Sequence, residues 1–444
     1  MEIALLCVYA GMLAHLSRKD WTKGDAAGSF FVNNRASGAA SVAFSLIVSC
    51  VGASATMGMA GMAFAIGTPA FWWLGSGAAG LVILATLVAE KVRKSGSFTM
   101  PEMVDKLLGP GARPLISVII VVGWLAILAA QFSALSKLLA ALIGFSPLPC
   151  LAIGYFLAVM HTMGGQAVVI RTDRLQFFIL AAGLVVLYLW LDANNPGWTE
   201  GLRIEAVNDR FTIKDLLRYA AVIGGNYVVC PMLYGRILSA RDATAARNGS
   251  MLAGAGIALC GLLIVAVGLS CRGLLPADTV PDAVLTTAVS TVFPRWLAVV
   301  VLLALISAVV SSADSCLVTA ATVLGYDLLR TPDASICRKC VATLGCLGAA
   351  LTFMNRGILD FLFMAYDVFV SGVAMPVFIA LLFSGKRTLR PGFSVVAIVI
   401  GGTLGCAAAV TGDFRFSFTG ILLSTAITMA GLLPRGGKQT DDAA

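Results

Sequence analysis

Long apolar segments separated by short polar loops recur along the whole chain. A run of about 20 mostly apolar residues is long enough to cross a bilayer as a helix. The pattern therefore predicts an all-α integral membrane protein with about 13 transmembrane helices. The expected spans cover residues 2–16, 38–66, 70–90, 113–144, 147–170, 174–192, 214–238, 248–272, 295–325, 338–355, 358–384, 392–411 and 415–434.

The composition agrees with this class, since 59% of the 444 residues are hydrophobic and only 12% are charged. Soluble domains carry about a quarter charged residues. In a membrane protein the net charge of +8 belongs mainly to cytoplasmic loops, so it does not indicate a nucleic-acid partner. Residues 2–16 lack the basic start and the cleavage site of a signal peptide, and we expect them to remain as the first span.

Basic residues gather in alternate loops, which predicts the topology because Lys and Arg favour the cytoplasmic side. The expected orientation in the plasma membrane has the N-terminus outside and the C-terminus in the cytoplasm, and it requires an odd number of spans. The basic residues that indicate it are Arg18, Lys19, Lys23, Arg35, Lys91, Arg93, Lys94, Arg171, Arg174, Arg236, Arg241, Arg247, Arg330, Arg338, Lys339, Lys386, Arg387, Arg390, Arg435 and Lys438.

The second expected span changes character in its middle. The apolar run gives way to a small and polar segment that includes Ser49, Gly52, Ser54 and Gly58, and then becomes apolar again. Transporters place unwound helix segments at such interruptions, where freed carbonyls coordinate ions. A glycine and serine groove packed against a neighbouring helix explains the same pattern.

A second polar pattern lies in the apolar span 295–325. Ser311, Ser315, Thr319 and Thr322 share one helix face, because residues three and four apart are neighbours. Such a cluster of neutral oxygens suits a hard monovalent cation, and a packing face with hydroxyls bonded to the preceding turn is the alternative. Packing does not explain Asp314, since a carboxylate inside the membrane indicates function.

The loop at residues 97–102 carries signals for the start of a helix. Thr99 suits the cap, Pro101 suits the first turn, and Glu102 follows Thr99 by three residues. We expect a short amphipathic helix over 102–108 on the cytoplasmic surface. The polar stretch 194–214 is expected to be an exterior loop with a short helix.

Several motifs together resemble those of the sodium:solute symporter family, in the family's order and spacing. They are the segments 30–35, 52–58 followed by Gly67, 97–102, Thr172 and Asp173 with Gln176, Pro231 with Arg236, and 308–327. The resemblance implies a core of five plus five helices related by inverted topology, with broken first and sixth core helices. It implies an extra helix and a cytoplasmic loop in residues 1–35, two inverted repeats in 36–192 and 193–385, and two accessory helices with a short tail in 386–444.

The resemblance also implies a sodium site between the first and eighth core helices. Its ligands are expected to be two kinds of oxygen, backbone carbonyls and serine hydroxyls. The carbonyls come from Val48, Val51 and Ala308, and the hydroxyls come from Ser311 and Ser312.

Some members of the family have a further sodium site nearer the cytoplasm. Asp173, Ser311 and Ser315 match it, and Asp314 replaces a serine that some relatives use. Two carboxylates there fit a second sodium ion, or a shared proton, because neighbouring like charges favour protonation of one group. A structural salt bridge between Asp173 and its flanking arginines is the alternative.

The substrate of this fold is expected near the bilayer midplane, between the broken helices and their neighbours. Gln131 lies in mid-span, where an unbonded amide is costly. Asp367 fits a cationic or hydroxylated substrate, or a bond to the helix backbone. Trp72 and Trp73 fit an outer gate or an aromatic belt at the membrane surface. The full candidate set is Ser49, Ser54, Trp72, Trp73, Gln131, Asn226, Tyr227 and Asp367.

Together these patterns predict sodium-coupled symport of a small organic solute by alternating access, with Na+ as the coupling ion. The expected partners are the solute, sodium and the lipid bilayer. An enzyme is not expected, because the sequence has no evident nucleophile–base pair, metal cluster or phosphate loop. The alternatives are a proton-coupled symporter of the same fold and a transporter-like sensor or regulatory subunit, although the few residues after the last span leave no room for a signalling module.

Overall fold

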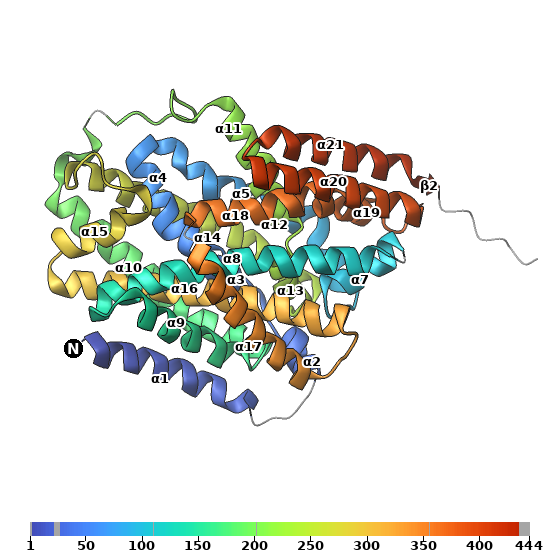
Figure 1. Ribbon diagram of the computed structural model, residues 1–444, viewed down its shortest axis with the longest axis horizontal. Coiled ribbons are helices and arrows are strands. Elements are labelled where there is room, and N and C mark those ends of the chain that lie inside the picture. The colour runs from blue at the N-terminus through green and yellow to red at the C-terminus, as the bar shows by residue number, and fades with distance from the viewer. Residues whose placement is uncertain (1, 22–26, 110, 201, 355, 435–444) are drawn as a thin grey trace, which may run out of the picture.

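The computed structural model describes residues 2–21, 27–109, 111–200, 202–354 and 356–434. Almost all of this part of the chain is helical (Figure 1). The strands β1 (Arg387–Leu389) and β2 (Leu432–Pro434) form one short antiparallel pair. Three basic residues of the topology argument, Lys23, Arg435 and Lys438, lie outside the described residues.

The first half of the chain contains the first broken helix and a long central helix, α8. Wide π-helical turns at Ser54–Gly58 and Leu84–Val88 continue neighbouring helices. The helices are α1 (Glu2–Trp21), α2 (Ala27–Val32), α3 (Ala39–Cys50), α4 (Met59–Ile66), α5 (Trp72–Ile83), α6 (Ala89–Lys94), α7 (Met100–Leu108), α8 (Ala112–Ile143), α9 (Pro147–Thr162) and α10 (Gln166–Asn194).

The second half begins after the polar stretch 194–214, which contains the short helical turn Pro196–Thr199, as expected. Further π-helical turns occur at Tyr219–Gly224, Val323–Leu328 and Val370–Ala374. The helices are α11 (Ile213–Arg218), α12 (Gly225–Val228), α13 (Pro231–Leu238), α14 (Ala243–Ser270), α15 (Val284–Thr291), α16 (Arg295–Thr322), α17 (Ala334–Leu351), α18 (Ile358–Phe369), α19 (Met375–Phe383), α20 (Pro391–Thr411) and α21 (Phe414–Ala430).

Within the described residues, nine helices are long and apolar enough to cross a membrane, and the bent segment 39–66 makes a tenth. The helices α9 and α21 are apolar but shorter. The N-terminal helix α1 adds a further 20-residue element. The all-α membrane fold is therefore confirmed, whereas the total of thirteen spans stays a prediction.

The expected boundary between spans 147–170 and 174–192 is wrong. Arg171 and Arg174 indicate a cytoplasmic loop by their charge, but both lie inside α10. The chain turns earlier, before Gly165, whose φ of +72° is a conformation that glycine adopts without strain. Asp173 therefore lies two turns inside a helix rather than at a helix end.

The short helix predicted from the 97–102 loop is confirmed as α7, although it begins two residues earlier, at Met100. Thr99 Oγ1 accepts a hydrogen bond from the Glu102 amide at 3.1 Å, and Glu102 Oε2 accepts one from the Phe98 amide at 2.8 Å. Thr99 Oγ1 also donates to Asp327 Oδ1 at 3.0 Å. The capping group thus ties this helix to the C-terminal end of the long segment that contains α16.

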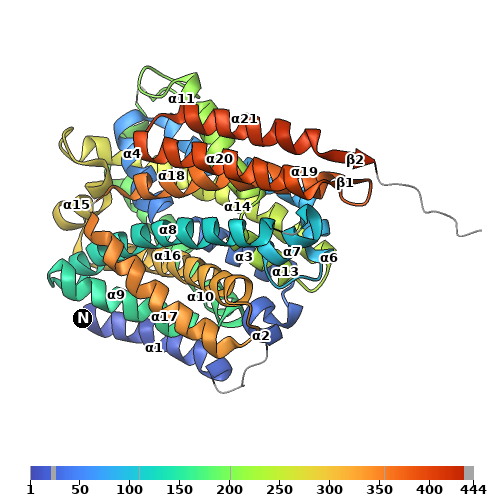
Figure 2. The same ribbon diagram turned by 45° about the vertical axis from the view of Figure 1, so that its right-hand side comes forward.

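The helix α16 lies at the centre of the bundle, where every residue from 304 to 318 is buried. It packs against α8, α9, α10 and α17. Both views place α1 at one edge of the bundle and α20 with α21 at the opposite edge (Figures 1 and 2). Tyr9 links α1 to the centre, since its Oη donates to Ser307 Oγ at 3.3 Å and accepts from Gln176 Nε2 at 3.3 Å.

Candidate ion and solute site

The first core helix breaks between α3 and the segment Ser54–Ile66, and its two halves are bent by 60°. The Val51 amide makes the last bond of α3, to the Ile47 carbonyl at 3.0 Å. The carbonyls of the last turn of α3 therefore lack the amide donors of a continuing helix, which leaves them available to side chains or to an ion, whereas the Gly52 carbonyl accepts from the Thr56 amide at 2.9 Å. The sixth core helix also breaks, between α12 and α13, where residues 229 and 230 leave the helical conformation. Both predicted breaks are present.

The helix α16 faces the first break directly. Ser312 Oγ donates to the Ser49 carbonyl at 2.9 Å, and Gln131 Oε1 accepts from the Ala53 amide at 3.0 Å. Gly52 lies between these two contacts, so a Cβ atom at this position would collide with the Ser312 hydroxyl and the Gln131 amide oxygen. Glycine therefore permits the close approach of the break to α16.

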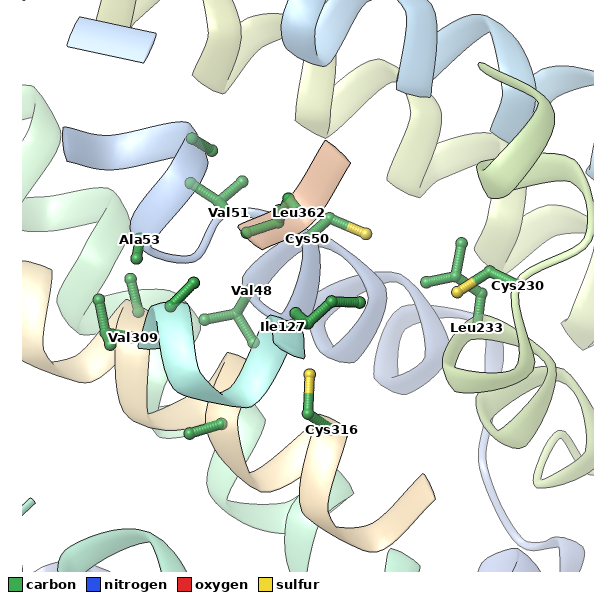
Figure 3. Packing of buried hydrophobic residues seen from close by; sticks show 14 of the residues in the cluster. Val48, Cys50, Val51, Ala53, Ile127, Cys230, Leu233, Val309, Cys316 and Leu362 are labelled. Carbon is green, nitrogen blue, oxygen red and sulfur yellow. The ribbon is translucent and has the colours of Figure 1, made fainter. Parts of the chain in front are cut away.

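All five residues expected to bind sodium lie in the interior beside this break. Figure 3 shows Val48 and Val51 on the broken helix, with α16 next to them. Val48, Val51, Ala308 and Ser311 are fully buried, and Ser312 is 3% exposed. Neutral carbonyl and hydroxyl oxygens of this kind fit a hard monovalent cation. Ser311 is the one whose hydroxyl turns away from the break.

A second polar cluster lies one helical turn further along α16, around the side chain of Asp173. Ser311 Oγ donates to Asp173 Oδ1 at 2.6 Å, and Ser45 donates to Asp173 Oδ2. Arg236 forms an ion pair with the same carboxylate at 3.5 Å. Ser315 accepts a hydrogen bond from the Arg236 guanidinium. The structure thus brings Asp173, Ser311 and Ser315 together, as expected, but around an arginine.

Arg236 is therefore misplaced by the topology argument, which assigns it to a cytoplasmic loop. Its side chain is fully buried on α13, immediately after the break in the sixth core helix. The flanking Arg171 and Arg174 do not pair with Asp173, because Arg171 donates to the Leu16 carbonyl and Arg174 donates to Ser41. The salt bridge of Asp173 exists, but with a different arginine.

Asp314 does not join this cluster. It is fully buried, and its Oδ1 accepts from Thr162 Oγ1 of α9 at 3.2 Å. Its Oδ2 has no hydrogen-bond partner among the residues that the structure describes. Asp314 thus faces α9 as a carboxyl group without a cationic partner in this part of the chain.

A small cavity lies on the other side of the break. Its volume is about 30 Å³, which is room for about one water molecule. Five predicted substrate residues line it: Ser49, Ser54, Gln131, Asn226 and Tyr227. Aromatic and sulfur-containing side chains complete the wall, namely Trp124, Tyr366, Cys50, Cys230, Met232 and Cys316. Figure 3 shows the three cysteines on three different segments around the break.

Two of the cavity's polar groups are free to bind a ligand. Asn226 Oδ1 and Trp124 Nε1 are buried and have no hydrogen-bond partner within the described chain. By contrast, Gln131 and Ser312 bond to the broken helix, and Ser49 Oγ accepts from Arg236 at 3.1 Å. An unpaired buried polar group costs about 1–3 kcal/mol, which a bound solute recovers by supplying the partner.

The remaining substrate candidates lie elsewhere. Trp73 packs edge-on against Tyr219 and Phe363. Trp72 Nε1 donates to the Ala206 carbonyl of the loop before α11 at 3.0 Å. The side chain of Asp367 points away from the cavity, toward α11 and α21.

The partners of Asp367 are cationic and polar protein groups. Arg218 forms an ion pair with its Oδ2 at 3.2 Å, and Ser417 Oγ donates to its Oδ1 at 2.7 Å. Its neighbour Tyr366 lines the cavity instead.

Sequence reasoning missed Ser45, Trp124 and Tyr366. Ser45 precedes Ser49 by four residues, so helical spacing alone places both on one face of α3. Trp124 and Tyr366 carry no comparable signal, because aromatic residues are common throughout apolar spans.

Comparisons with known proteins agree with this geometry. The model of the family described as sodium:solute symporter family matches residues 30–194. A sodium/glucose cotransporter of Vibrio parahaemolyticus is 25% identical over 338 residues, which are 66% of this chain and 62% of that protein. A high-affinity choline transporter of Caenorhabditis elegans is 26% identical over 288 residues, which are 56% of this chain and 47% of that protein. The matches thus span less than two thirds of the length of either relative.

The fold agrees over a longer stretch. The solved structure of a Na+-coupled sialic acid symporter in a substrate-bound, outward-open state superposes with a TM-score of 0.81 and covers 97% of each chain, at 15% sequence identity. At this identity the likeness concerns the fold alone. The chain is a multi-pass membrane protein, and its resemblance to the sodium:solute symporter family, first indicated by its motifs, is confirmed in sequence and in fold.

Proposed function

We propose that the chain is a secondary active transporter that couples sodium to the uptake of a small organic solute across the plasma membrane. The contact between Ser312 and the Ser49 carbonyl carries the proposal, because it sets a hydroxyl of α16 against the freed carbonyls of the broken helix. The sodium-coupled relatives and the family match support it. An ion held between these helices drives transport only through its different affinities for the outward-open and inward-open states.

In this proposal, residues 36–192 and 193–385 are the two inverted repeats, and the N-terminus lies outside. Sodium binds the carbonyls of Val48, Val51 and Ala308 and the hydroxyl of Ser312, with the Ser311 hydroxyl turning toward it when the ion arrives. Since α3 and α16 contribute ligands from opposite sides, the ion favours the conformation in which the two helices lie close together.

The test is uptake into proteoliposomes across a panel of metabolites, with and without a sodium gradient. Ser312→Ala removes one ligand and one hydrogen bond, worth about 0.5–1.5 kcal/mol, so the sodium concentration for half-maximal uptake should rise roughly 2- to 12-fold. Ser250→Ala is the matched control, since this buried hydroxyl donates to the Ala246 carbonyl of its own helix at 2.8 Å. Sodium-independent uptake by the wild-type protein would refute the proposal.

The cavity favours a compact solute with few polar groups. It is lined by three aromatic side chains, Trp124, Tyr227 and Tyr366, and by no charged residue among those described. Aromatic faces attract ammonium groups, whereas a sugar needs a hydrogen-bond partner for every buried hydroxyl. Among the lining groups, the free Asn226 oxygen supplies one acceptor and the Trp124 N–H one donor, and the hydroxyls of Ser54, Tyr227 and Tyr366 add only a few more. We therefore propose a solute closer in chemistry to the choline of one relative than to the glucose of the other.

Competition against a transported solute distinguishes these chemistries. Small quaternary ammonium compounds should inhibit uptake at lower concentrations than hexoses. Asn226→Ala should weaken solute binding while leaving the sodium dependence unchanged, because Asn226 belongs to α12 and not to α3 or α16, which carry the ion ligands. Preferential hexose uptake would contradict the proposed class.

A second candidate, proton coupling, rests on Asp314. This carboxyl group is fully buried and lacks a cationic partner in the described residues, and an isolated carboxylate is costly in such a place. If Asp314 carries the coupling proton, a pH gradient without sodium drives uptake, and Asp314→Asn abolishes it. Unchanged uptake in Asp314→Asn removes this candidate.

A further inference from the structure

We infer that an apolar groove on the outside of the bundle binds the acyl chain of a membrane lipid. The groove has a volume of about 420 Å³, within the range of about 300–1,000 Å³ that small-molecule sites occupy. Its walls come from α5, from the segment that contains α11 and α12, from the segment that contains α18 and α19, and from α21. It shares no residue with the cavity around the break or with the proposed sodium ligands.

The groove belongs to the surface that the helices turn toward lipid. Three of its walls are segments long and apolar enough to cross a membrane, and the fourth, α21, is a shorter apolar helix. Ile83 is 40% exposed, and Ala79 and Ala220 are exposed as well. None of the lining residues is charged. An exposed apolar surface of this kind on membrane-spanning helices contacts acyl chains.

Small residues and wide helical turns hollow out this surface. The π-helical turns Tyr219–Gly224 and Val370–Ala374 both contribute wall residues. Small residues in membrane helices usually let two helices approach closely. Gly80 does so, since a Cβ atom there would lie 2.4 Å from the Gly224 carbonyl oxygen. Other small residues of the walls, such as Ala221, border the open volume instead.

The length of the groove matches one leaflet of a bilayer. Trp72 and Ile83 both line it and lie on the same helix, so at about 1.5 Å per residue the groove is about 16 Å long. Half of the hydrocarbon core of a bilayer is about 15 Å thick. A helix of this length, about 10 Å across, would occupy roughly 1,300 Å³, three times the volume of the groove. The space therefore fits an extended chain and not a helix of a second copy.

A buried hydroxyl near one end of the groove lacks a partner. Ser76 lines the groove, is 4% exposed, and its Oγ has no hydrogen-bond partner among the residues that the structure describes. A serine in an apolar helix commonly donates to the carbonyl of the preceding turn, but this one does not. Ser76 lies one turn from Trp72, a residue type that favours the level of the lipid headgroups. The ester carbonyl that joins an acyl chain to its headgroup lies near that level and accepts such a bond.

The groove lies behind the half-helix that lines the solute cavity. Val228 and Val229 line the groove, whereas Asn226 and Tyr227 line the cavity. A lipid chain in the groove therefore packs against the back of α12, next to the break in the sixth core helix.

Photolabelling in nanodiscs tests the inference. The purified full-length protein is placed in palmitoyl-oleoyl phosphatidylglycerol with a small fraction of the same lipid carrying a diazirine in the middle of one acyl chain. Mass spectrometry then locates the labelled residues. The segments around Ala79 and Ala221 should take up several-fold more label than those around Phe156 and Phe178, which are 62% and 59% exposed. Labelling in the groove should also saturate as the fraction of the probe rises.

Ala221→Phe fills the groove and should lower its labelling to the level seen at Phe156 and Phe178. Ala152→Phe is the matched control, because it makes the same change at an exposed alanine of α9 outside the groove, and it should leave the labelling as it is. If Ala221→Phe does not fold, Ala79→Phe fills the groove from another wall. Groove labelling in the wild-type protein no stronger than at Phe156 and Phe178 would overturn the inference. So would exclusion of the probe together with cross-links between the α21 helices of two copies, since a second copy would then cover the groove.

Discussion

Of the arginine–aspartate pairs inside this helical bundle, the pair of Arg236 with Asp173 and the pair of Arg218 with Asp367 have the same chemistry in different surroundings. In the pair of Arg236 and Asp173, both side chains are 0% exposed. In the pair of Arg218 and Asp367, the arginine side chain is 21% exposed and lies over the Phe363 ring, 4.2 Å from its centroid. The first pair is therefore fully enclosed by protein, whereas the guanidinium of the second pair is partly exposed at the protein surface.

The polar neighbours of the two pairs differ as well. Serine hydroxyls from two helices surround the first pair, while Ser417 alone donates to Asp367. The first arrangement has the composition of a cation site, and the second joins α18 to α11 and α21 as a brace. The same ion pair thus differs in how many hydroxyl oxygens surround it.

Asp173→Asn should give the largest effect. It leaves the Arg236 charge buried without a counter-charge, which costs about 3–5 kcal/mol of the free energy of unfolding. A thermal-denaturation series in detergent and an uptake assay should show a strongly lowered midpoint and no transport. The double variant Asp173→Asn with Arg236→Gln should recover most of the stability. If the single variant Asp173→Asn were as stable as the wild-type protein, burial would not make the first pair more sensitive to loss of its counter-charge than the second.

Asp367→Asn should have a smaller effect, of about 1–3 kcal/mol, because it removes charge-assisted hydrogen bonds while Arg218 keeps partial exposure and its ring contact. The same denaturation series measures it. The ranking of transported solutes should not change, since Asp367 does not line the cavity. An altered ranking would return Asp367 to the substrate site.

The smallest effects should come from single hydroxyls. Ser45→Ala and Ser417→Ala each remove one hydrogen bond to a carboxylate, with a cost of about 0.5–1.5 kcal/mol. Ser45→Ala should lie at the upper end, because its hydroxyl also accepts from Arg236. Thermal midpoints of the two variants, measured side by side, check the order. A larger loss in Ser417→Ala would invert the comparison.

Local signals in the sequence predict much of this architecture. The Thr99 and Glu102 pair predicts α7 because capping depends on residues three apart. The glycines and serines at 49–58 predict the first broken helix, because they interrupt an apolar run within a few neighbouring residues. The helical stripe on α16 likewise predicts that Ser311 and Ser315 share one surface, which faces Asp173 in the fold.

Charged residues inside the membrane are where prediction fails. Arg236 and Arg171 indicate loops by their charge, although the fold pairs or bonds both of them in the interior. The partner of Asp367 is Arg218, which lies 149 positions away, and no local pattern connects them. A charged residue in an apolar segment can lie in a loop, bind a ligand or join two helices. Which of these it does depends on contacts with distant residues, and these contacts are known only from the fold.

The three thiols of the cavity wall give the protein a reporter of its own motion. Cys50, Cys230 and Cys316 lie around a space of about 30 Å³, too small for a reagent to enter while it is closed. Cys7, Cys346 and Cys406 are exposed and react at any time, so alkylation must be followed at the three cavity thiols by peptide mass spectrometry, where its rate measures how often the space opens. Applied from one side of the membrane at a time, a charged thiol reagent would time the opening toward that side without any engineered label.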